Sequence, residues 1–258
     1  MRVQGKVVVV TGGASGIGKA LCERFAAEGA EAVVVVDRNG PGAEAVAAAI
    51  GGHAETCDLG DQAQVTDLVA RVEARFGRID VLCNNAGIAN DQDFLEGDVD
   101  PWEQQWAVNV MAHVHAVRAA LPAMLDRGEG YLFHTASMAG ILTTHGAAAY
   151  AATKHAVVGL AEWLALTYGH RGIKVWLLAP LGVDTPMLDK SSEWAAQAAG
   201  PVKSPAQVAQ QVVDAFDAER FLIYTDPIAA QWVERKNSDL DRWLGGMNRL
   251  QQRIEAAG

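Results

Sequence analysis

Cysteine is scarce in this sequence. Its 258 residues include Cys22, Cys57 and Cys83, which are odd in number, widely spaced and without a CxxC pair. Each lies in an apolar stretch, so we expect buried free thiols in a reducing compartment. A disulfide framework and a zinc site are both disfavoured.

Positive charge is also limited. Lys and Arg number 21 against 31 Asp and Glu, and no basic run occurs. This balance argues against a general nucleic-acid or anionic-membrane surface. Met1–Lys6 lead directly into a strand-like run with no signal peptide, and the apolar runs are too short to span a membrane. We therefore expect a soluble, cytoplasmic protein without nucleic-acid or membrane partners.

Hydrophobic residues make up half of the chain and fall into two kinds of segment. Short runs such as Val7–Val10 are apolar throughout, which is typical of parallel strands covered on both faces. The predicted strands are Val7–Thr11, Ala32–Asp37, His53–Asp58, Asp80–Asn84, Tyr131–Ala136, Lys174–Ala179 and Phe221–Thr225. The predicted helices are Ile17–Glu28, Gly42–Ala49, Gln62–Phe76, Pro101–Leu125, Ala149–Gly169 and Pro205–Ala218.

Alternation of strands and helices with short connections predicts right-handed βαβ units. They build an α/β fold, a doubly wound parallel sheet of Rossmann type with about seven strands and helices on both faces. No repeat or linker interrupts the pattern, so we predict one NAD(P)-binding domain over residues 1–258.

The chain after Thr225 differs from the rest. Apolar residues at helical spacing predict an amphipathic extension over about 226–258, weakened by Gly245-Gly246. We expect this extension to pack against the domain or a partner subunit, and closure of a substrate pocket is the alternative.

A glycine-rich turn, TGGASGIG, occupies Thr11–Gly18 between the first predicted strand and helix. Glycines there let the backbone approach a pyrophosphate, and the helix N-terminus supplies free N–H groups. Glycines in a turn can also serve conformation alone. The placement between a strand and a helix favours a dinucleotide site.

Asp37 ends the second strand, 19 residues beyond Gly18. A carboxylate there accepts hydrogen bonds from the adenosine ribose and repels a 2′-phosphate, which favours NAD over NADP. Arg38 follows directly and offers such a phosphate a partner, so NADP remains the alternative. Considered without the other motifs, Asp58 after the third strand is interpreted as the N-terminal cap of the following helix, a role that Asp61 fills equally well.

Tyr150 and Lys154 are four residues apart on a predicted helix and therefore share one face. A nearby cation lowers the pKa of a phenol, which is about 10 when free. Ser137 follows the fifth strand, at the sheet edge where open α/β folds bind ligands. Its hydroxyl can hold a substrate oxygen while the tyrosine exchanges a proton.

These motifs resemble, in order and spacing, the classical short-chain dehydrogenases/reductases. The resemblance runs from about Val3 to Phe221 and includes TGxxxGIG, NNAG at Asn84–Gly87, and YxxxK, with Ser137 and Tyr150 13 residues apart. It implies strand order 3-2-1-4-5-6-7 and hydride transfer between nicotinamide and a carbinol carbon. It also implies a homo-oligomer, a tetramer or dimer, that pairs the helices containing Asn109 and Tyr150.

The resemblance assigns a role to each matching residue. Tyr150 is the general acid/base, Lys154 lowers its pKa and binds the nicotinamide ribose, and Ser137 polarises the carbonyl or orients the alcohol. Asn109 holds a water of the proton relay. The residues expected to bind the cofactor are Gly12, Ser15, Gly16, Ile17, Gly18, Asp37, Arg38, Asp58, Leu59, Asn85, Ala86, Gly87, Tyr150, Lys154, Pro180, Val183 and Thr185.

One position departs from the family pattern. Leu181 stands where the family has glycine in Pro-Gly-x-Val-x-Thr, although Pro180, Val183 and Thr185 match. Its side chain is expected to narrow the pocket beside the nicotinamide or to shift the backbone. An apolar substrate is indicated by the composition of the segments that line the pocket in similar proteins: Met138, Ile141, Leu142, Met187, Leu188 and Trp194.

The sequence therefore predicts an NAD-dependent oxidoreductase that interconverts a secondary alcohol and its ketone. The alternatives are an NADPH-linked ketoreductase, served by Arg38, and a non-catalytic NAD-binding sensor or scaffold, favoured only by Leu181. No metal is expected, because His113 and His115 are two apart on a helix and face different directions.

Overall fold

A computed structural model describes residues 1–188 and 200–256 of the chain. Its parallel sheet has seven strands in the order β3-β2-β1-β4-β5-β6-β7, which confirms the predicted fold class and strand order. The strands are β1 Val7–Thr11, β2 Ala32–Asp37, β3 His53–Thr56, β4 Val81–Asn84, β5 Gly130–Thr135, β6 Ile173–Ala179 and β7 Leu222–Tyr224. Each lies within two residues of its prediction.

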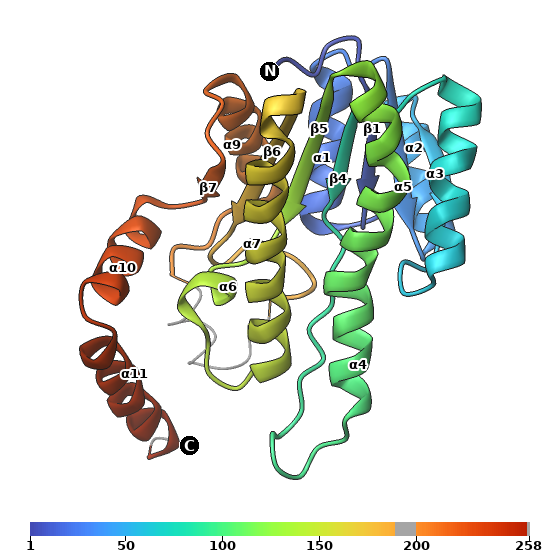
Figure 1. Ribbon diagram of the computed structural model, residues 1–258. Coiled ribbons are helices and arrows are strands. Elements are labelled where there is room, and N and C mark those ends of the chain that lie inside the picture. Colours follow the sequence, from blue (N-terminus) through green and yellow to red (C-terminus); the bar gives the residue numbers. More distant parts are fainter. Residues whose placement is uncertain (189–199, 257–258) are drawn as a thin grey trace.

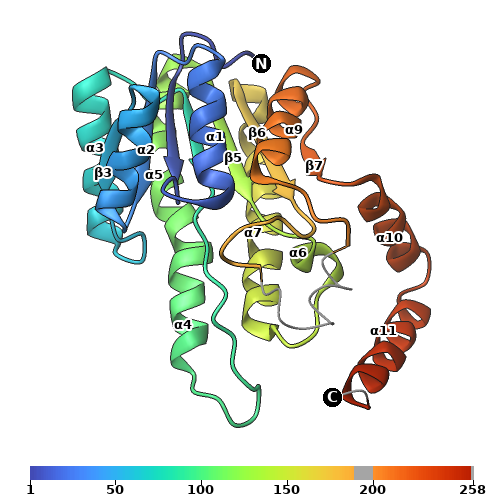
Figure 2. The ribbon, with the colours of Figure 1, turned by 180° about the vertical axis from the view of Figure 1, so that it is seen from behind.

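Helices cover both faces of the sheet (Figures 1 and 2). One face carries α1 Gly16–Ala27, α2 Gly40–Ile50 and α9 Pro205–Asp217, and the other carries α3 Gln62–Phe76, α5 Ala112–Arg127 and α7 Ala148–Tyr168. Shorter helical segments are α6 Ala139–Leu142 and η2 Gly169–Arg171. The uniformly apolar runs are explained by this arrangement, since Val8 and Val10 pack in one cluster and Val9 in the other.

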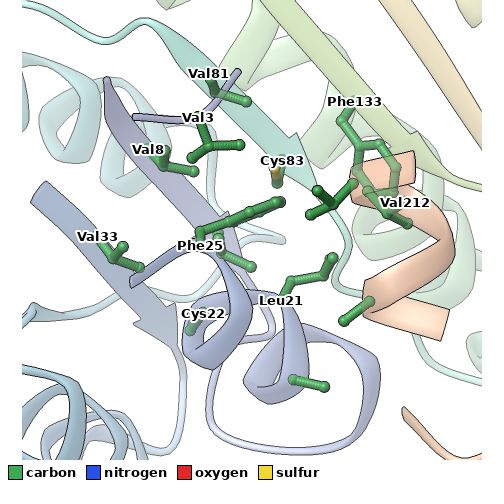
Figure 3. Packing of buried hydrophobic residues seen from close by; sticks show 14 of the residues in the cluster. Val3, Val8, Leu21, Cys22, Phe25, Val33, Val81, Cys83, Phe133 and Val212 are labelled. Carbon is green, nitrogen blue, oxygen red and sulfur yellow. The ribbon is translucent and has the colours of Figure 1, made fainter. Parts of the chain in front are cut away.

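Aromatic rings fill the layer between the sheet and α1 and α9, part of which is shown in Figure 3. Phe25 of α1 stacks on Phe216 of α9 with ring centroids 6.0 Å apart, and Trp176 of β6 lies 4.6 Å from Phe216. All three side chains are buried. Each such ring removes about 150–250 Å² from water.

The predicted helix over Pro101–Leu125 is interrupted. It divides into α4 Asp100–Trp106, a π-type segment η1 Ala107–Met111, and α5. Asn109 lies within the π segment and is fully buried. Such bulges frequently occur at functional sites, because the extra residue in the turn redirects a side chain.

The extension forms two helices, α10 Pro227–Ser238 and α11 Leu240–Glu255. Asp239 separates them in an extended conformation, and its carboxylate accepts a hydrogen bond from Arg242 N at 2.9 Å, which caps α11. Gly245 and Gly246 both lie inside α11, so the helix continues through them. Among the described helices, none has the length and apolar character needed to cross a membrane.

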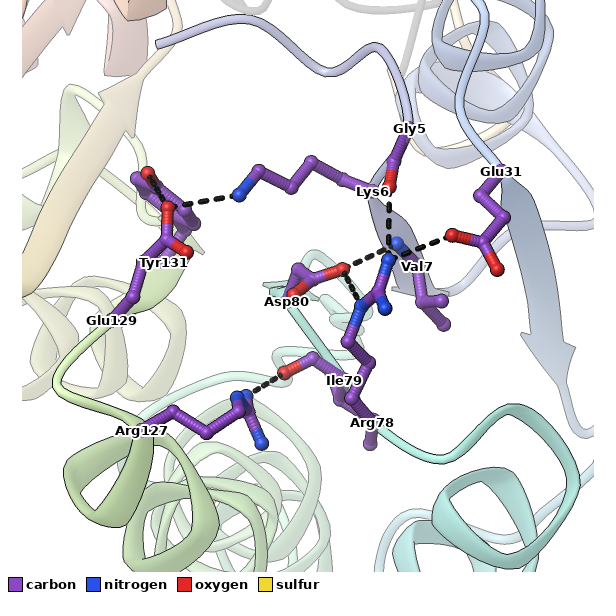
Figure 4. Close-up of polar contacts among 10 residues, drawn as sticks. All are labelled: Gly5, Lys6, Val7, Glu31, Arg78, Ile79, Asp80, Arg127, Glu129 and Tyr131. Carbon is purple, nitrogen blue, oxygen red and sulfur yellow. Dashed lines mark hydrogen bonds and ion pairs between the residues drawn. The ribbon is translucent and has the colours of Figure 1, made fainter.

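Asp80 joins charged side chains at the amino ends of the central strands (Figure 4). Its buried carboxylate accepts from Val7 N and from Arg78 Nε, both at 2.8 Å. Arg78 also donates to Gly5 O at 3.0 Å and to exposed Glu31 at 2.7 Å. The start of β1 is thus held to the segment preceding β4.

Replacing Asp80 tests this anchor. Asp80→Ala leaves the Val7 N–H buried without its acceptor, so we expect the free energy of unfolding to fall by about 2–3 kcal/mol in urea denaturation. Glu31→Ala removes an exposed partner of the same arginine and should cost less than about 1 kcal/mol. Equal effects of the two substitutions would contradict this account.

Candidate active site

Three central strands are joined at their carboxyl ends by the side chains of Thr11, Asn85 and Thr135. Thr11 Oγ1 accepts from Asn85 N at 2.9 Å and from Ala86 N at 3.1 Å. Asn85 Nδ2 donates to Thr11 O at 3.0 Å, and its Oδ1 accepts from Thr135 Oγ1 at 3.0 Å. These bonds brace β1, β4 and β5 where the strand order reverses, the point at which open α/β sheets bind ligands. The sequence placed Asn85 near a ribose and Thr11 at the start of the glycine turn, and it gave no sign of the role of Thr135.

The glycine turn lies at this edge in a conformation that requires its glycines. Gly12 and Gly16 have φ values of 68° and 52°. A Cβ on Gly18 would stand 2.1 Å from Gly12 O. Ser15, at the N-cap of α1, makes no side-chain capping bond. The tight turn and the N–H groups beyond it suit an anionic pyrophosphate, so the residues present fit a dinucleotide.

Asp37 lies beside this turn at the end of β2. Its Oδ2 accepts from Ala14 N at 3.1 Å and its Oδ1 from Asn39 N at 2.9 Å. The carboxylate is therefore held at the edge of the glycine loop. Arg38 is exposed and forms no ion pair among the described residues.

Asp58 follows β3, which ends two residues earlier than predicted. The cap of α3 is Asp61, whose side chain accepts from Ala63 N at 2.8 Å and Gln64 N at 3.2 Å. Asp58 instead accepts from Gly60 N at 2.9 Å, next to buried Leu59. The helix-cap interpretation of Asp58 is wrong, and its exposed carboxylate remains at the sheet edge.

Ser137, Tyr150 and Lys154 converge beyond β5. Lys154 is 2% exposed, and its Nζ donates to Thr135 O at 2.9 Å while lying 5.6 Å from the Tyr150 ring centroid. Ser137 Oγ accepts from Ala139 N at 3.1 Å and lies close enough to the Tyr150 phenol to lower its pKa. The hydroxyl, phenol and ammonium predicted to act together are therefore neighbours.

Burial determines the titration of this cluster. It lowers the pKa of Lys154 to about 8. It also raises the pKa of Tyr150, an effect that the hydrogen bond with Ser137 opposes and the charge of Asp91 reinforces. The lowered tyrosine pKa expected from the sequence is absent in the protein alone. Desolvation is the largest of the effects on this pKa.

Asp91 is a residue that sequence reasoning missed. Its Oδ1 accepts from Ala149 N at 2.9 Å and Tyr150 N at 3.2 Å, the first turn of α7. Ala147 at the N-cap offers no acceptor of its own. The carboxylate thus caps α7 and fixes Tyr150 from a loop 58 residues away in sequence, where no local pattern could indicate it.

Asn109 is fixed by contacts on both sides. Its Oδ1 accepts from Ile88 N at 2.8 Å, and its Nδ2 donates to Ile88 O at 2.9 Å and to Thr153 Oγ1 at 3.1 Å. A Cβ on Gly87 would stand 3.1 Å from Lys154 Nζ and 3.2 Å from Asn109 Oδ1. Gly87 therefore leaves space where these two side chains approach each other.

The segment after β6 returns to the same edge. Pro180 O accepts from Met138 N at 3.0 Å, Val183 forms a bridge with Lys203, and a Cβ on Gly16 would stand 3.1 Å from Thr185 Cγ2. Leu181 packs in an apolar cluster with Met138 of the Ser137 loop and Trp232 of α10. Trp194, expected near the pocket, lies outside the described residues.

Comparison with known proteins agrees with this geometry. A model of the short chain dehydrogenase family matches residues 6–196. The 1-deoxy-11-beta-hydroxypentalenate dehydrogenase of Streptomyces exfoliatus is 38% identical over 234 residues, covering 88% of this chain and 85% of that protein. The D-threitol dehydrogenase of Mycolicibacterium smegmatis is 37% identical over 195 residues, covering 74% and 75%. A short-chain dehydrogenase/reductase of Burkholderia phymatum, solved in complex with NAD, superposes with a TM-score of 0.84 at 27% identity, covering 93% and 96%.

The buried ammonium of Lys154 predicts a pH-dependent cost in stability. Its pKa falls from 10.5 in the unfolded chain to about 8, so the folded state binds fewer protons between these values. Wild-type stability should therefore rise with pH across this window relative to Lys154→Met. At pH 7 the lysine is charged in both states, and we expect the variant to be more stable by about 1–3 kcal/mol in urea unfolding.

Exposed Lys19 supplies the matched control, since Lys19→Met should leave the pH dependence unchanged. A Lys154→Met variant whose stability relative to wild type does not change between pH 7 and 10 would refute the inferred burial cost.

Proposed function

The chain belongs to the short-chain dehydrogenase family, and we propose that it is an NAD-dependent oxidoreductase acting on the CH–OH group of a secondary alcohol or on the corresponding ketone. The observation that carries this proposal is the contact between Ser137, Tyr150 and Lys154 at the sheet edge beside the glycine turn. A hydroxyl, a phenol and an ammonium supply the three functions that proton exchange at a carbinol oxygen needs.

The proposed cofactor site follows the sheet edge. The glycine turn would hold the pyrophosphate through Gly12, Ser15, Gly16, Ile17 and Gly18. The adenosine half would lie against Asp37, Arg38, Asp58, Leu59, Asn85, Ala86 and Gly87, and the nicotinamide half against Tyr150, Lys154, Pro180, Val183 and Thr185. When bound, the nicotinamide supplies the acceptor or donor of the hydride.

The residues of this chain handle the proton. In ketone reduction, Tyr150 donates its phenolic proton to the substrate oxygen, which Ser137 holds. In alcohol oxidation, Tyr150 takes the hydroxyl proton back. Its raised pKa keeps the phenol protonated at neutral pH in the protein alone, so oxidation needs positive charge close to the oxygen. Lys154 provides such charge below its pKa of about 8, and Asn109 positions a water for the relay.

The substrate is proposed to be apolar near its reacting carbon. Met138 and Leu142 are buried in the cluster that Leu181 and Trp232 join, directly after Ser137 in the chain. The two relatives are dehydrogenases of a hydroxypentalenate and of D-threitol, alcohols that differ in polarity. We propose that this apolar cluster forms one wall of the substrate pocket and determines which alcohols the enzyme accepts.

We propose one cofactor-binding domain with a C-terminal extension, assembled as a homotetramer or dimer through α5 and α7. Leu166 on α7 is 83% exposed, and Trp163 on the same helix is also exposed, which leaves an apolar surface for a partner. The proposed location is the cytoplasm, and the free, buried thiols of Cys22, Cys57 and Cys83 support it, because free thiols persist in a reducing compartment.

Removing the phenol tests the mechanism. We expect Tyr150→Phe to lower kcat for a confirmed secondary alcohol by about 10²–10⁴, because the general acid/base is lost. NADH affinity, measured by fluorescence titration, should change little. Tyr168→Phe, at the far end of α7, is the matched control.

Retained turnover in Tyr150→Phe would contradict the mechanism. A wild-type protein that binds NADH and oxidises no member of a secondary-alcohol panel would support a non-catalytic sensor instead.

Asp37 determines the proposed cofactor preference. Wild-type protein should bind NADH more tightly than NADPH, and Asp37→Ser should raise NADPH affinity at least about tenfold by removing repulsion of the 2′-phosphate. Asp58→Asn removes another exposed carboxylate at the same sheet edge and should leave the preference unchanged. Tighter binding of NADPH by the wild type would favour the NADPH-linked reductase.

A further inference from the structure

Asp91 joins two segments that carry residues of the site. Its Oδ1 accepts from Ala149 N at 2.9 Å and from Tyr150 N at 3.2 Å, in the first turn of α7. Its Oδ2 accepts from Gln105 Nε2 at 3.2 Å, near the end of α4. Gln105 is fully buried, and Asn109 follows it four residues later. One carboxylate therefore connects the segment of Asn109 with the helix of Tyr150.

The bond to Tyr150 holds the backbone of the proposed general acid/base itself. Tyr150 is the third residue of α7, and the first N–H groups of a helix have no acceptor within the helix. Ala147 at the N-cap makes no side-chain capping bond. Without the oxygen of Asp91, the turn that carries the phenol would therefore lose the side-chain acceptor that holds it.

The negative charge of Asp91 acts on the same phenol. The N-terminus of a helix is its positive end, which favours a phenolate there. The Asp91 carboxylate lies at this end and opposes that effect. Burial is the largest cause of the raised pKa of Tyr150, and the charge of Asp91 raises this pKa further. The Lys154 ammonium, with Nζ 5.6 Å from the ring centroid, carries the opposite charge.

Other titratable groups lie farther along the elements around the phenol or are neutral. Burial lowers the pKa of two buried histidines, to about 3 in His134 and well below its usual range in His113, so both are neutral at pH 7. Two carboxylates of α4 are exposed, so solvent screens their charge. Besides Lys154 and Asp91, the groups on these elements are His113 on α5, His134 on β5, His145 in the loop before α7, and Asp100 and Glu103 on α4.

We propose that Asp91 is a positioning residue for the proton transfer, in which its oxygen and its charge have separate effects. The oxygen fixes the backbone of Tyr150 and with it the direction of the phenol. The charge favours the protonated phenol, the form that donates to a ketone, and so disfavours alcohol oxidation at neutral pH. This inference rests on the proposed function, because it assumes that Tyr150 exchanges a proton with the substrate.

Two substitutions of Asp91 separate these effects. Asp91→Ala removes the acceptor, so we expect kcat for a confirmed secondary alcohol to fall at least about tenfold at every pH. Asp91→Asn keeps an oxygen for Ala149 N and Tyr150 N and should recover most of this loss. Its amide would face Gln105, whose Oε1 has no partner among the described residues and accepts once that amide is rotated. Because Asp91→Asn removes the charge, the acid limb of its pH profile for oxidation should move at least about half a pH unit lower.

A control in the same loop is Asp93→Asn. Asp93 accepts from Leu95 N at 2.9 Å and Glu96 N at 2.8 Å, and no bond from it to α7 occurs in the described part of the chain. This variant should keep the wild-type pH profile. An unmoved profile in Asp91→Asn, or an equal shift in Asp93→Asn, would overturn the proposal. Equal values of kcat in Asp91→Ala and Asp91→Asn would overturn it as well.

A titration of the phenol needs no turnover and separates this inference from the proposed function. NMR of isotope-labelled tyrosine follows the phenol directly, and the signal lost in Tyr150→Phe identifies it. We expect the Tyr150 signal of Asp91→Asn to titrate at least about half a pH unit below that of wild type. A signal that titrates at the wild-type pH refutes the inference, whatever the wild type oxidises. Circular dichroism at each pH establishes that the variants are folded.

Discussion

The geometry of the site depends on the hydrogen bonds of Asn85 to the strands on either side. Its amide donates to Thr11 O and its side-chain oxygen accepts from Thr135, so β1, β4 and β5 end in a fixed relation. The same Thr135 offers its backbone oxygen to the Lys154 ammonium. One chain of contacts therefore connects the glycine turn, which Thr11 begins, with the lysine of α7. Neither half of the site can shift without disturbing the other.

Burying Lys154 and Tyr150 costs free energy that their local contacts only partly offset. Desolvation disfavours the charged forms of both Lys154 and Tyr150. The Thr135 carbonyl and the Tyr150 ring face offset part of the cost of burying the Lys154 ammonium. Ser137 offsets part of the cost of ionising the Tyr150 phenol. Such a cluster costs stability in the free protein, which is common where a site must later stabilise charge. Hydrogen bonds between residues at the carboxyl ends of the strands hold the site in place.

Sequence patterns predicted the features that are set locally or by strand order. The strands of Val7–Thr11 and Val33–Val36 followed from uniform hydrophobicity, and the positions of Asp37 and Ser137 followed because they end or follow strands. Contacts between distant segments could not be predicted in this way. His113 pairs with His134, with Nδ1 atoms 3.1 Å apart, although the sequence directed attention to its neighbour at 115. The π segment and the capping of α7 by a distant loop likewise have no short-range signal, because their causes lie in tertiary packing.

Leu181, the position that departs from the family pattern, packs against the C-terminal extension. Leu181 replaces an expected glycine, and the extension beyond β7 supplies Trp232; a Cβ built on Gly200 would lie 3.2 Å from the leucine and 3.3 Å from the tryptophan. Both pack with Met138, which directly follows Ser137. The glycine turn and the Tyr150–Lys154 pair lie elsewhere on the sheet edge. In the proposed function, Leu181 would shape the wall of the substrate pocket and would leave the proposed proton-transfer residues in place, which argues for altered specificity rather than lost catalysis.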